Sequence, residues 1–349
     1  MNRSHAAYVG LGAGPHRTPP DLEGRAADGL ATKARRLARS PLARRLGGAA
    51  VLGFLVWRLG VEQSVRAVGA IDARALAAAL VLTALTTFCC AWRWSLVAAA
   101  IGAQVPLRTA VAACYRSQFL NTATPGGVLG DVHRGVRHGR RTGSAARGLR
   151  SVLMERSAGQ VVQAGMALVT LSVLPSPMRS SVAWAWAAVV VIALCVGLAG
   201  RSGRRRGRDG LGSTWMGEVR RGVLARRTGP LVALASALAV GGHVLTFLVA
   251  ARTAGSTASA TRLVPLAFVV LIAMGIPVNI AGWGPREGVA AWVFGAAGLG
   301  AGAGLSTAVV YGVLVLVTSL PGAVVLVVAH GRARPRPAVG RVAEEVARG

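Results

Sequence analysis

Three short polar segments, each set within a long apolar stretch, carry the residues best suited to bind a ligand. The first, FLNTATPGGVLGDVHRGVRHG (119–139), is interrupted at Pro125 and two glycines and then carries charged side chains. Proline and paired glycine allow a sharp turn and a close approach of the backbone to a ligand. A helix that restarts near Gly127 would direct free N–H groups at this turn, which favours an anion such as phosphate. The candidate binding residues of this segment are Asn121, Pro125, Gly126, Gly127, Gly130, Asp131 and Arg134.

Asp131 and Arg134 stand three residues apart, so they can form an ion pair on one helix face. The second segment, LMERSAGQVVQAG, adds Glu155 and Arg156, which are adjacent and therefore point to different sides of a helix. Glu155 is expected to pair with Arg134 or Arg286. A purely structural ion pair remains the alternative to a binding role.

The third segment, GIPVNIAGWGPREG (275–288), combines helix breakers with adjacent opposite charges inside an apolar region. Charges at membrane depth are costly unless they are satisfied internally, and they often mark functional sites. A structural pair that stabilises a re-entrant turn is the alternative interpretation. The candidate binding residues of this segment are Pro277, Asn279, Gly282, Gly284, Arg286 and Glu287.

Catalytic and metal motifs are not evident. His133 beside Asp131 could support acid–base chemistry, but no nucleophile, zinc motif or P-loop accompanies them. The four cysteines lie in apolar stretches without metal-binding or disulfide spacing. We therefore expect no enzyme activity, no cofactor and no metal. The Trp92-Arg93-Trp94 triplet is expected to anchor a helix at the membrane interface. The Gly/Ala run 295–304, which contains the spacing Gly298-x-x-x-Gly302, is expected to serve helix packing.

Composition shows which elements must position these residues. The 349-residue chain is 53% hydrophobic and has a formal net charge of +28. A basic chain could bind nucleic acid, but apolar runs of about 20 residues match the roughly 30 Å hydrocarbon core of a bilayer. The sequence therefore predicts an all-α, polytopic integral membrane protein with no nucleic-acid partner.

The apolar pattern predicts about six full spans and two broken, re-entrant helical segments. The expected full spans are 46–60, 75–100, 150–174, 181–200, 230–252 and 303–330. The broken segments are 106–133 and 262–298.

Arginine-rich loops alternate with loops that contain few basic residues, and this bias predicts that both termini lie in the cytoplasm. The assignment requires 106–133 to enter from the cytoplasmic face and 262–298 from the opposite face. Two broken segments that enter from opposite faces suggest an inverted repeat. Many transporters have their binding sites between such segments. Non-helical backbone at this depth must be buried in protein or line a wet cavity.

The motif N-x-x-x-P-G-G-x-x-G-D-x-x-R (121–134), followed by E-R and by the Pro277-to-Glu287 pattern, resembles the transmembrane, flippase-like domain of lysylphosphatidylglycerol synthases. The resemblance covers roughly residues 46–330. We expect 1–45 to be a disordered basic cytoplasmic tail, 46–330 the flippase-like domain and 331–349 a short cytoplasmic tail. Ala281-Gly282 stands where the family usually has two glycines, a minor departure.

This resemblance implies a protein of the cytoplasmic membrane that binds, and flips, an anionic or aminoacylated phospholipid or another lipid-linked substrate. The full synthases also have a soluble domain that transfers an amino acid from tRNA, and we expect neither that activity nor tRNA binding here. One alternative is a non-transporting partner subunit of a lipid-modifying enzyme. Another is an intramembrane headgroup transferase that uses Asp131, His133 or Glu287.

Overall fold

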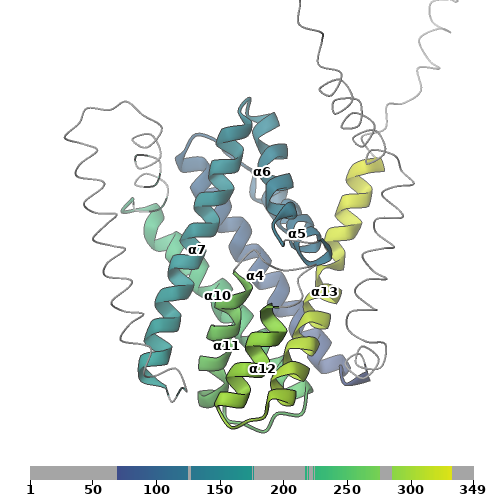
Figure 1. Cartoon of the computed structure of the whole chain (residues 1–349). Coiled ribbons are helices and arrows are strands. Elements are labelled where there is room, and N and C mark those ends of the chain that lie inside the picture. The colour runs from purple at the N-terminus through teal and green to yellow at the C-terminus, as the bar shows by residue number, and fades with distance from the viewer. Residues whose placement is uncertain are drawn as a thin grey trace, which may run out of the picture. The chain divides into compact units, whose positions relative to one another are not determined.

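The computed structural model describes residues 69–124, 127–174, 176, 217, 219, 223, 225–275 and 285–331. This part of the chain consists of α-helices joined by short loops and contains no strand (Figure 1). The helices are α4 (Ala73–Ala100), α5 (Leu107–Ala123), α6 (Leu129–Arg141), α7 (Ala145–Val173), α10 (Thr228–Thr253), α11 (Ala260–Met274), α12 (Pro285–Ala296) and α13 (Ala301–Gly331). The all-α prediction is confirmed.

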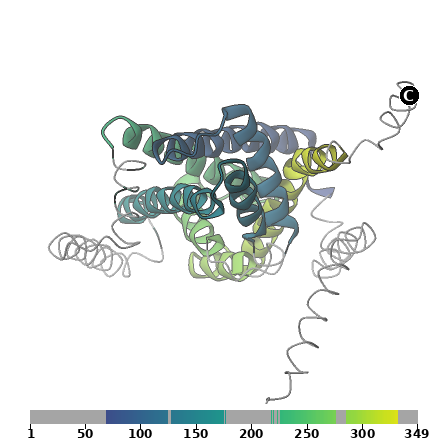
Figure 2. The same ribbon diagram turned by 90° about the horizontal axis from the view of Figure 1, so that it is seen from above.

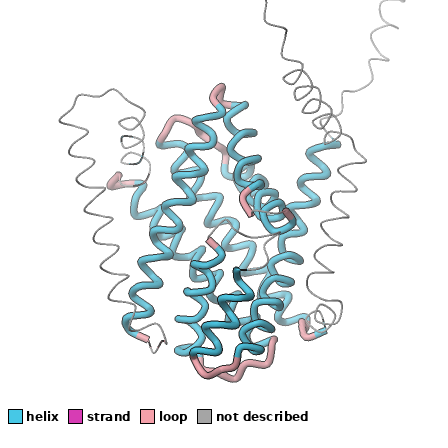
Figure 3. The backbone as a smooth tube through the Cα atoms, viewed as in Figure 1, coloured by secondary structure: helices cyan, strands magenta, loops and turns pink. Residues whose placement is uncertain are grey.

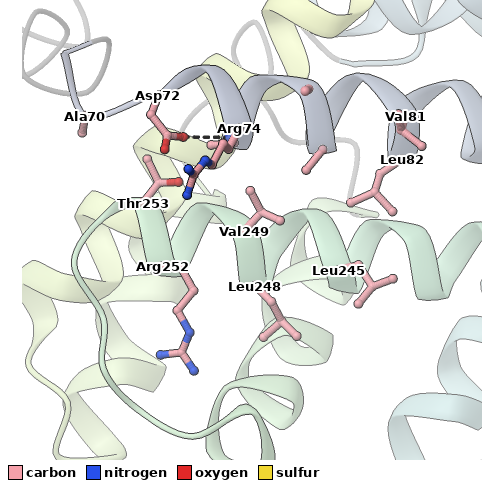
Figure 4. Close-up of a pocket in the computed structure, with 13 residues that line it drawn as sticks. Ala70, Asp72, Arg74, Val81, Leu82, Leu245, Leu248, Val249, Arg252 and Thr253 are labelled. Atoms are coloured by element: carbon pink, nitrogen blue, oxygen red, sulfur yellow. Dashed lines mark hydrogen bonds between the residues drawn. The ribbon is translucent and has the colours of Figure 1, made fainter.

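Side-chain caps begin two of the long helices. The Asp72 carboxylate accepts a hydrogen bond of 2.7 Å from the Ala75 N–H at the start of α4 (Figure 4). The Ser144 hydroxyl accepts one of 3.3 Å from the Arg147 N–H at the start of α7. Such caps satisfy N–H groups that have no partner within the helix.

Three helices among the described residues are long and apolar enough to cross a bilayer, namely Ala73–Ala100, Thr228–Thr253 and Ala301–Val328. Predicted spans 75–100, 150–174, 230–252 and 303–330 correspond to helices α4, α7, α10 and α13. Predicted spans 46–60 and 181–200 lie outside the described residues. Large apolar side chains, including Val81, Val161 and Val327, face outward at 68–72% exposure, as expected for a surface covered by lipid.

The first predicted helix break occurs where the sequence places it, and most of the second, residues 276–284, lies outside the described residues. The first separates α5 from α6: Thr124 adopts an extended conformation and Gly127 has a φ of 62°, which glycine adopts without strain. The second separates α11, which ends at Met274, from α12, which begins at Pro285.

Each break joins a pair of packed helices, α5 with α6 and α11 with α12. These two hairpins occupy opposite halves of the helical bundle (Figure 1). The loop between α6 and α7 and the loop between α10 and α11 lie at opposite ends of the bundle (Figure 3). The structure thus places one hairpin in each half of the bundle, and the entry of the two segments from opposite faces of a membrane stays a prediction.

Glycines permit close contacts of α6 with both of its neighbours in the chain, α5 and α7. A Cβ atom on Gly130 of α6 would collide with the Ser117 carbonyl of α5. A Cβ atom on Gly148 of α7 would collide with the backbone of Gly135 and Gly139 of α6. In the view from above, α5 and α6 lie between α7 and α13 (Figure 2).

The packing role predicted for the Gly/Ala run 295–304 is present at Gly304 and not at the Gly298-x-x-x-Gly302 pair. A Cβ added to either glycine would meet no described atom within 4 Å. Gly298 has a φ of 70° and serves the turn between α12 and α13. The close contact occurs instead at Gly304, where a Cβ would collide with the Ala290 carbonyl of α12.

Candidate functional site

A polar cavity of about 270 Å³ lies where the two hairpins meet the long helices. Every described helix contributes to its wall. Its charged and polar lining includes Arg93, Arg134, Arg156, Arg286, Asp131, Glu155, Asn121, Gln160, Gln163 and His243. Polar groups gathered at the centre of a bundle with an apolar exterior are typical of a ligand site.

Glu155 is the centre of an ion-pair network on one side of this cavity. Its side chain is 2% exposed. One carboxylate oxygen accepts hydrogen bonds from Arg93, including one of 2.9 Å from Nε, and the other accepts one of 2.8 Å from Arg134. The predicted Glu155–Arg134 pair is therefore present. Glu155 thereby connects α4, α6 and α7.

Asp131 forms the second carboxylate centre. It pairs with Arg134 at 3.2 Å, as the three-residue spacing predicts, and also with Arg156 of α7. Ser117 and Asn121 of α5 donate further hydrogen bonds of 2.8 and 2.9 Å to its two oxygens. Asp131 thus holds α5, α6 and α7 together around the helix break.

Asn121 also satisfies the start of α6. Its Oδ1 accepts a hydrogen bond of 2.8 Å from the Gly130 N–H, while its Nδ2 donates to Asp131. The sequence predicts that the first N–H groups of this helix are available to an anion. For Gly130 that expectation is wrong, because Asn121 bridges the break and occupies the N–H.

Arg93 is the residue that sequence reasoning placed incorrectly. It is 6% exposed and lies in the network, with Glu155 on one side and the Ser236 hydroxyl of α10 at 3.0 Å on the other. It therefore does not serve as an interfacial anchor. The sequence does contain a signal for this position. An arginine inside the apolar stretch 75–100 requires a buried anion, and Glu155 could pair with more than one arginine.

Arg286 enters the cavity from the second hairpin. Its guanidinium donates hydrogen bonds of 3.1 and 2.6 Å to Glu287 and lies 5.8 Å from the centroid of the Tyr311 ring. Arg286 is 5% exposed and lines the cavity, whereas Glu287 is not among the lining residues. The guanidinium is therefore aimed from α12 towards the α13 side of the chamber.

The structure brings together most of the predicted binding residues that it describes. Asn121, Gly127, Asp131, Arg134, Glu155, Arg156 and Arg286 all line the cavity. Gly130 and Glu287 support these residues from outside the wall. Pro125, Gly126, Pro277, Asn279, Gly282 and Gly284 lie outside the described residues.

The wall of the cavity carries an excess of positive charge. Four arginines line it, against the two carboxylates of Asp131 and Glu155, and cations still outnumber anions when Glu287 is included. Both lining carboxylates are already bound to arginine. The Arg156 side chain is 48% exposed and has the greatest freedom to meet a ligand. The cavity is therefore suited to an anionic group.

A larger hollow, of about 960 Å³, lies between α4 and α10 (Figure 4). Its walls are chiefly apolar, with Val81, Leu82 and Leu245 among them, and its charged residues gather at one end near Asp72. It lacks the convergent polar groups of the central cavity. We therefore regard the central cavity as the candidate functional site.

Gly159 provides the space that Arg93 occupies. A Cβ on Gly159 would lie 2.6 Å from the nearer guanidinium nitrogen of Arg93, which is fixed by Glu155 and Ser236. We expect Gly159→Ala to displace this guanidinium and to destabilise the protein by about 1–3 kcal/mol, as overpacking does. Thermal unfolding of the purified protein in detergent measures this effect.

Gly165→Ala on the same helix is the matched control, because a Cβ there meets no described atom within 4 Å. It should leave the unfolding midpoint unchanged or raise it slightly, since alanine favours helix. Equal midpoints for the two variants would show that Arg93 does not need the space at Gly159.

The apolar exterior, the paired helix hairpins and the cationic chamber together define a polytopic helical membrane protein with an internal polar site. The chain belongs to the family of the lysylphosphatidylglycerol synthase TM region, whose family model matches residues 42–322. The resemblance noted from its motifs is thus confirmed. Membership links the protein to lipid handling in a membrane. No curated protein shows significant similarity to the chain.

Proposed function

We propose that the protein translocates a phospholipid, or another lipid-linked headgroup, across the cytoplasmic membrane. The observation that carries the proposal is the cationic cavity enclosed between two hairpins from opposite halves of the bundle. Its arginines would attract the phosphate of the headgroup, while Asp131, Glu155 and Glu287 hold those arginines in place. Both termini would lie in the cytoplasm.

The size of the cavity supports a headgroup as the part of the lipid that enters. A volume of about 270 Å³ is just below the roughly 300–1,000 Å³ typical of pockets for drug-sized ligands. A headgroup fits such a volume, while the acyl chains remain in the hydrocarbon outside. An aminoacylated headgroup would place its phosphate at the arginines and its amine towards the amide and hydroxyl groups of the wall.

We favour a transporter over a transferase. His133, the expected acid–base partner of Asp131, lines a separate small cavity together with Arg116 and His138. Asp131 is occupied by two arginines, a serine and an asparagine. Neither residue is therefore arranged for proton transfer to a substrate in the central cavity.

Lipid movement by the purified protein tests this proposal. Vesicles that contain wild-type protein and a fluorescent phosphatidylglycerol should expose inner-leaflet label to an external quencher faster than protein-free vesicles. Arg156→Ala should slow this exposure by about tenfold, because a charge-assisted hydrogen bond contributes about 1.5–3 kcal/mol. Arg74→Ala is the control, since Arg74 is exposed and lines only the α4–α10 hollow.

Quenching at the protein-free rate with correctly inserted wild-type protein would contradict the transport proposal. It would favour the alternative of a membrane subunit that binds lipid for a separate lipid-modifying enzyme.

A further inference from the structure

A second group of arginines lies on the other side of the α5–α6 hairpin. Arg137 and Arg141 are four residues apart and so share one face of α6, and Arg116 of α5 joins them around a cavity of about 20 Å³. We call these three residues the basic cluster. Trp94 and His138 form part of the same wall, and His138 Nε2 lies 2.8 Å from the Ala103 carbonyl oxygen.

Arg116 is buried in this cluster, and one of its guanidinium nitrogens makes no hydrogen bond to a described residue. Its side chain is 8% exposed, and its Nε has no hydrogen-bond partner among the described residues. No carboxylate lines the small cavity as the structure describes it. A buried cation is costly unless an anion or a hydrogen-bond acceptor meets it.

The acidic residues of the described chain are all engaged elsewhere. Asp72 caps α4, and Glu287 binds Arg286. Asp131 and Glu155 belong to the network of the central cavity. Among the described residues, therefore, none supplies a carboxylate to the basic cluster, and an anion that binds there would come from a ligand.

The dimensions of the site indicate which group enters it. A cavity of about 20 Å³ accommodates about one oxygen atom, since a water needs at least roughly 10–15 Å³. The remainder of a larger anion would lie at the mouth, where Arg141 is exposed. Phosphate fits this requirement, because one of its oxygens can reach Arg116 while the others meet Arg137 and Arg141.

We propose that Arg116, Arg137 and Arg141 form a second, phosphate-binding site, distinct from the central cavity. Arg134 lies between the two sites, but its guanidinium is bound to Glu155, Asp131 and Cys114. Basic pockets between membrane helices commonly bind anionic headgroups. The phosphate belongs either to a lipid of the adjoining leaflet or to a soluble phosphate. The proposal does not depend on lipid translocation.

Binding to the full-length protein in an uncharged detergent tests the site with two probes, phosphatidic acid and inorganic phosphate. Native mass spectrometry measures lipid affinity, and the shift of the thermal unfolding midpoint measures both probes. The double variant Arg137→Ala/Arg141→Ala should weaken binding by about tenfold or more, because each basic residue near an anionic headgroup contributes substantially. Arg140→Ala is the control, since Arg140 is an exposed neighbour on α6 that does not line the cavity.

The variant Arg116→Met distinguishes a binding role of Arg116 from a purely structural one through the unfolding midpoint with and without the probe. Removing an uncompensated buried charge should raise the unfolding midpoint of the ligand-free protein and abolish the further rise on addition of the probe. Loss of phosphatidic acid binding in the variants identifies a lipid as the source, and loss of inorganic phosphate binding identifies a soluble ligand. Affinities for both probes equal to those of Arg140→Ala would overturn the proposal.

Discussion

Replacing Glu155 with glutamine is expected to destabilise the protein by about 3–5 kcal/mol, the cost of breaking a buried ion pair by removing one partner. Glu155 is 1% exposed as a whole residue and compensates Arg93 and Arg134, which are themselves 6% and 5% exposed. Glutamine keeps the shape but leaves two buried guanidinium groups without their shared anion. The thermal unfolding midpoint and the monodisperse fraction of the purified protein should both fall.

Glu155→Asp keeps the charge but shortens the side chain, so its midpoint should lie between those of the wild type and Glu155→Gln. The double variant Arg93→Met/Glu155→Met replaces one pair with apolar side chains of similar length and leaves Arg134 with Asp131. It should be more stable than Glu155→Gln, and a double-mutant cycle measures the coupling. A wild-type midpoint for Glu155→Gln would contradict the central role of this carboxylate.

Loss of the Arg286 guanidinium should have the largest effect on lipid movement. Among the described residues, Arg286 is the cation of the α11–α12 hairpin that lines the cavity. Its guanidinium donates a hydrogen bond to Glu287 and lies over the ring of Tyr311. Arg286→Ala and Glu287→Ala are each expected to abolish headgroup translocation in reconstituted vesicles while the protein still inserts. Arg286→Lys should retain part of the activity, because lysine keeps the charge but loses the planar fork.

Arg262→Ala is the matched control for these variants. Arg262 lies on the same hairpin, but it is exposed and donates its hydrogen bond to the Ala297 carbonyl in the turn after α12. It should translocate lipid at the wild-type rate. Wild-type rates in Arg286→Ala and Glu287→Ala would rule out this part of the cavity as the lipid site.

Much of the fold could be predicted because its signals are local. The break at 125–127 follows from proline and glycine, and the Asp131–Arg134 pair follows from a three-residue spacing. The helix ranges follow from apolar length. The family resemblance rests on the same local motifs.

The position of Arg93 could not be predicted by such reasoning, because its carboxylate partner lies 62 residues away. Two flanking tryptophans made it look interfacial, yet Trp94 is 1% exposed and stacks edge-on against His138. The double role of Asn121 was also missed, since a bridge across a helix break depends on the angle between the two helices. Glycine spacing misled at Gly298 for a similar reason: it identifies a small surface but not whether another helix lies against it.

The glycine contacts between α6 and α7 restrict how the cavity can open. Gly148 lies so close to the backbone of Gly135 and Gly139 that a Cβ atom on it would collide with them, so the two helices pack backbone against backbone at this point. We therefore expect α6 and α7 to move as one unit, in which the ion pair of Asp131 and Arg156 is carried along. A motion that opened the chamber would then shift these two helices together and would not separate them from each other.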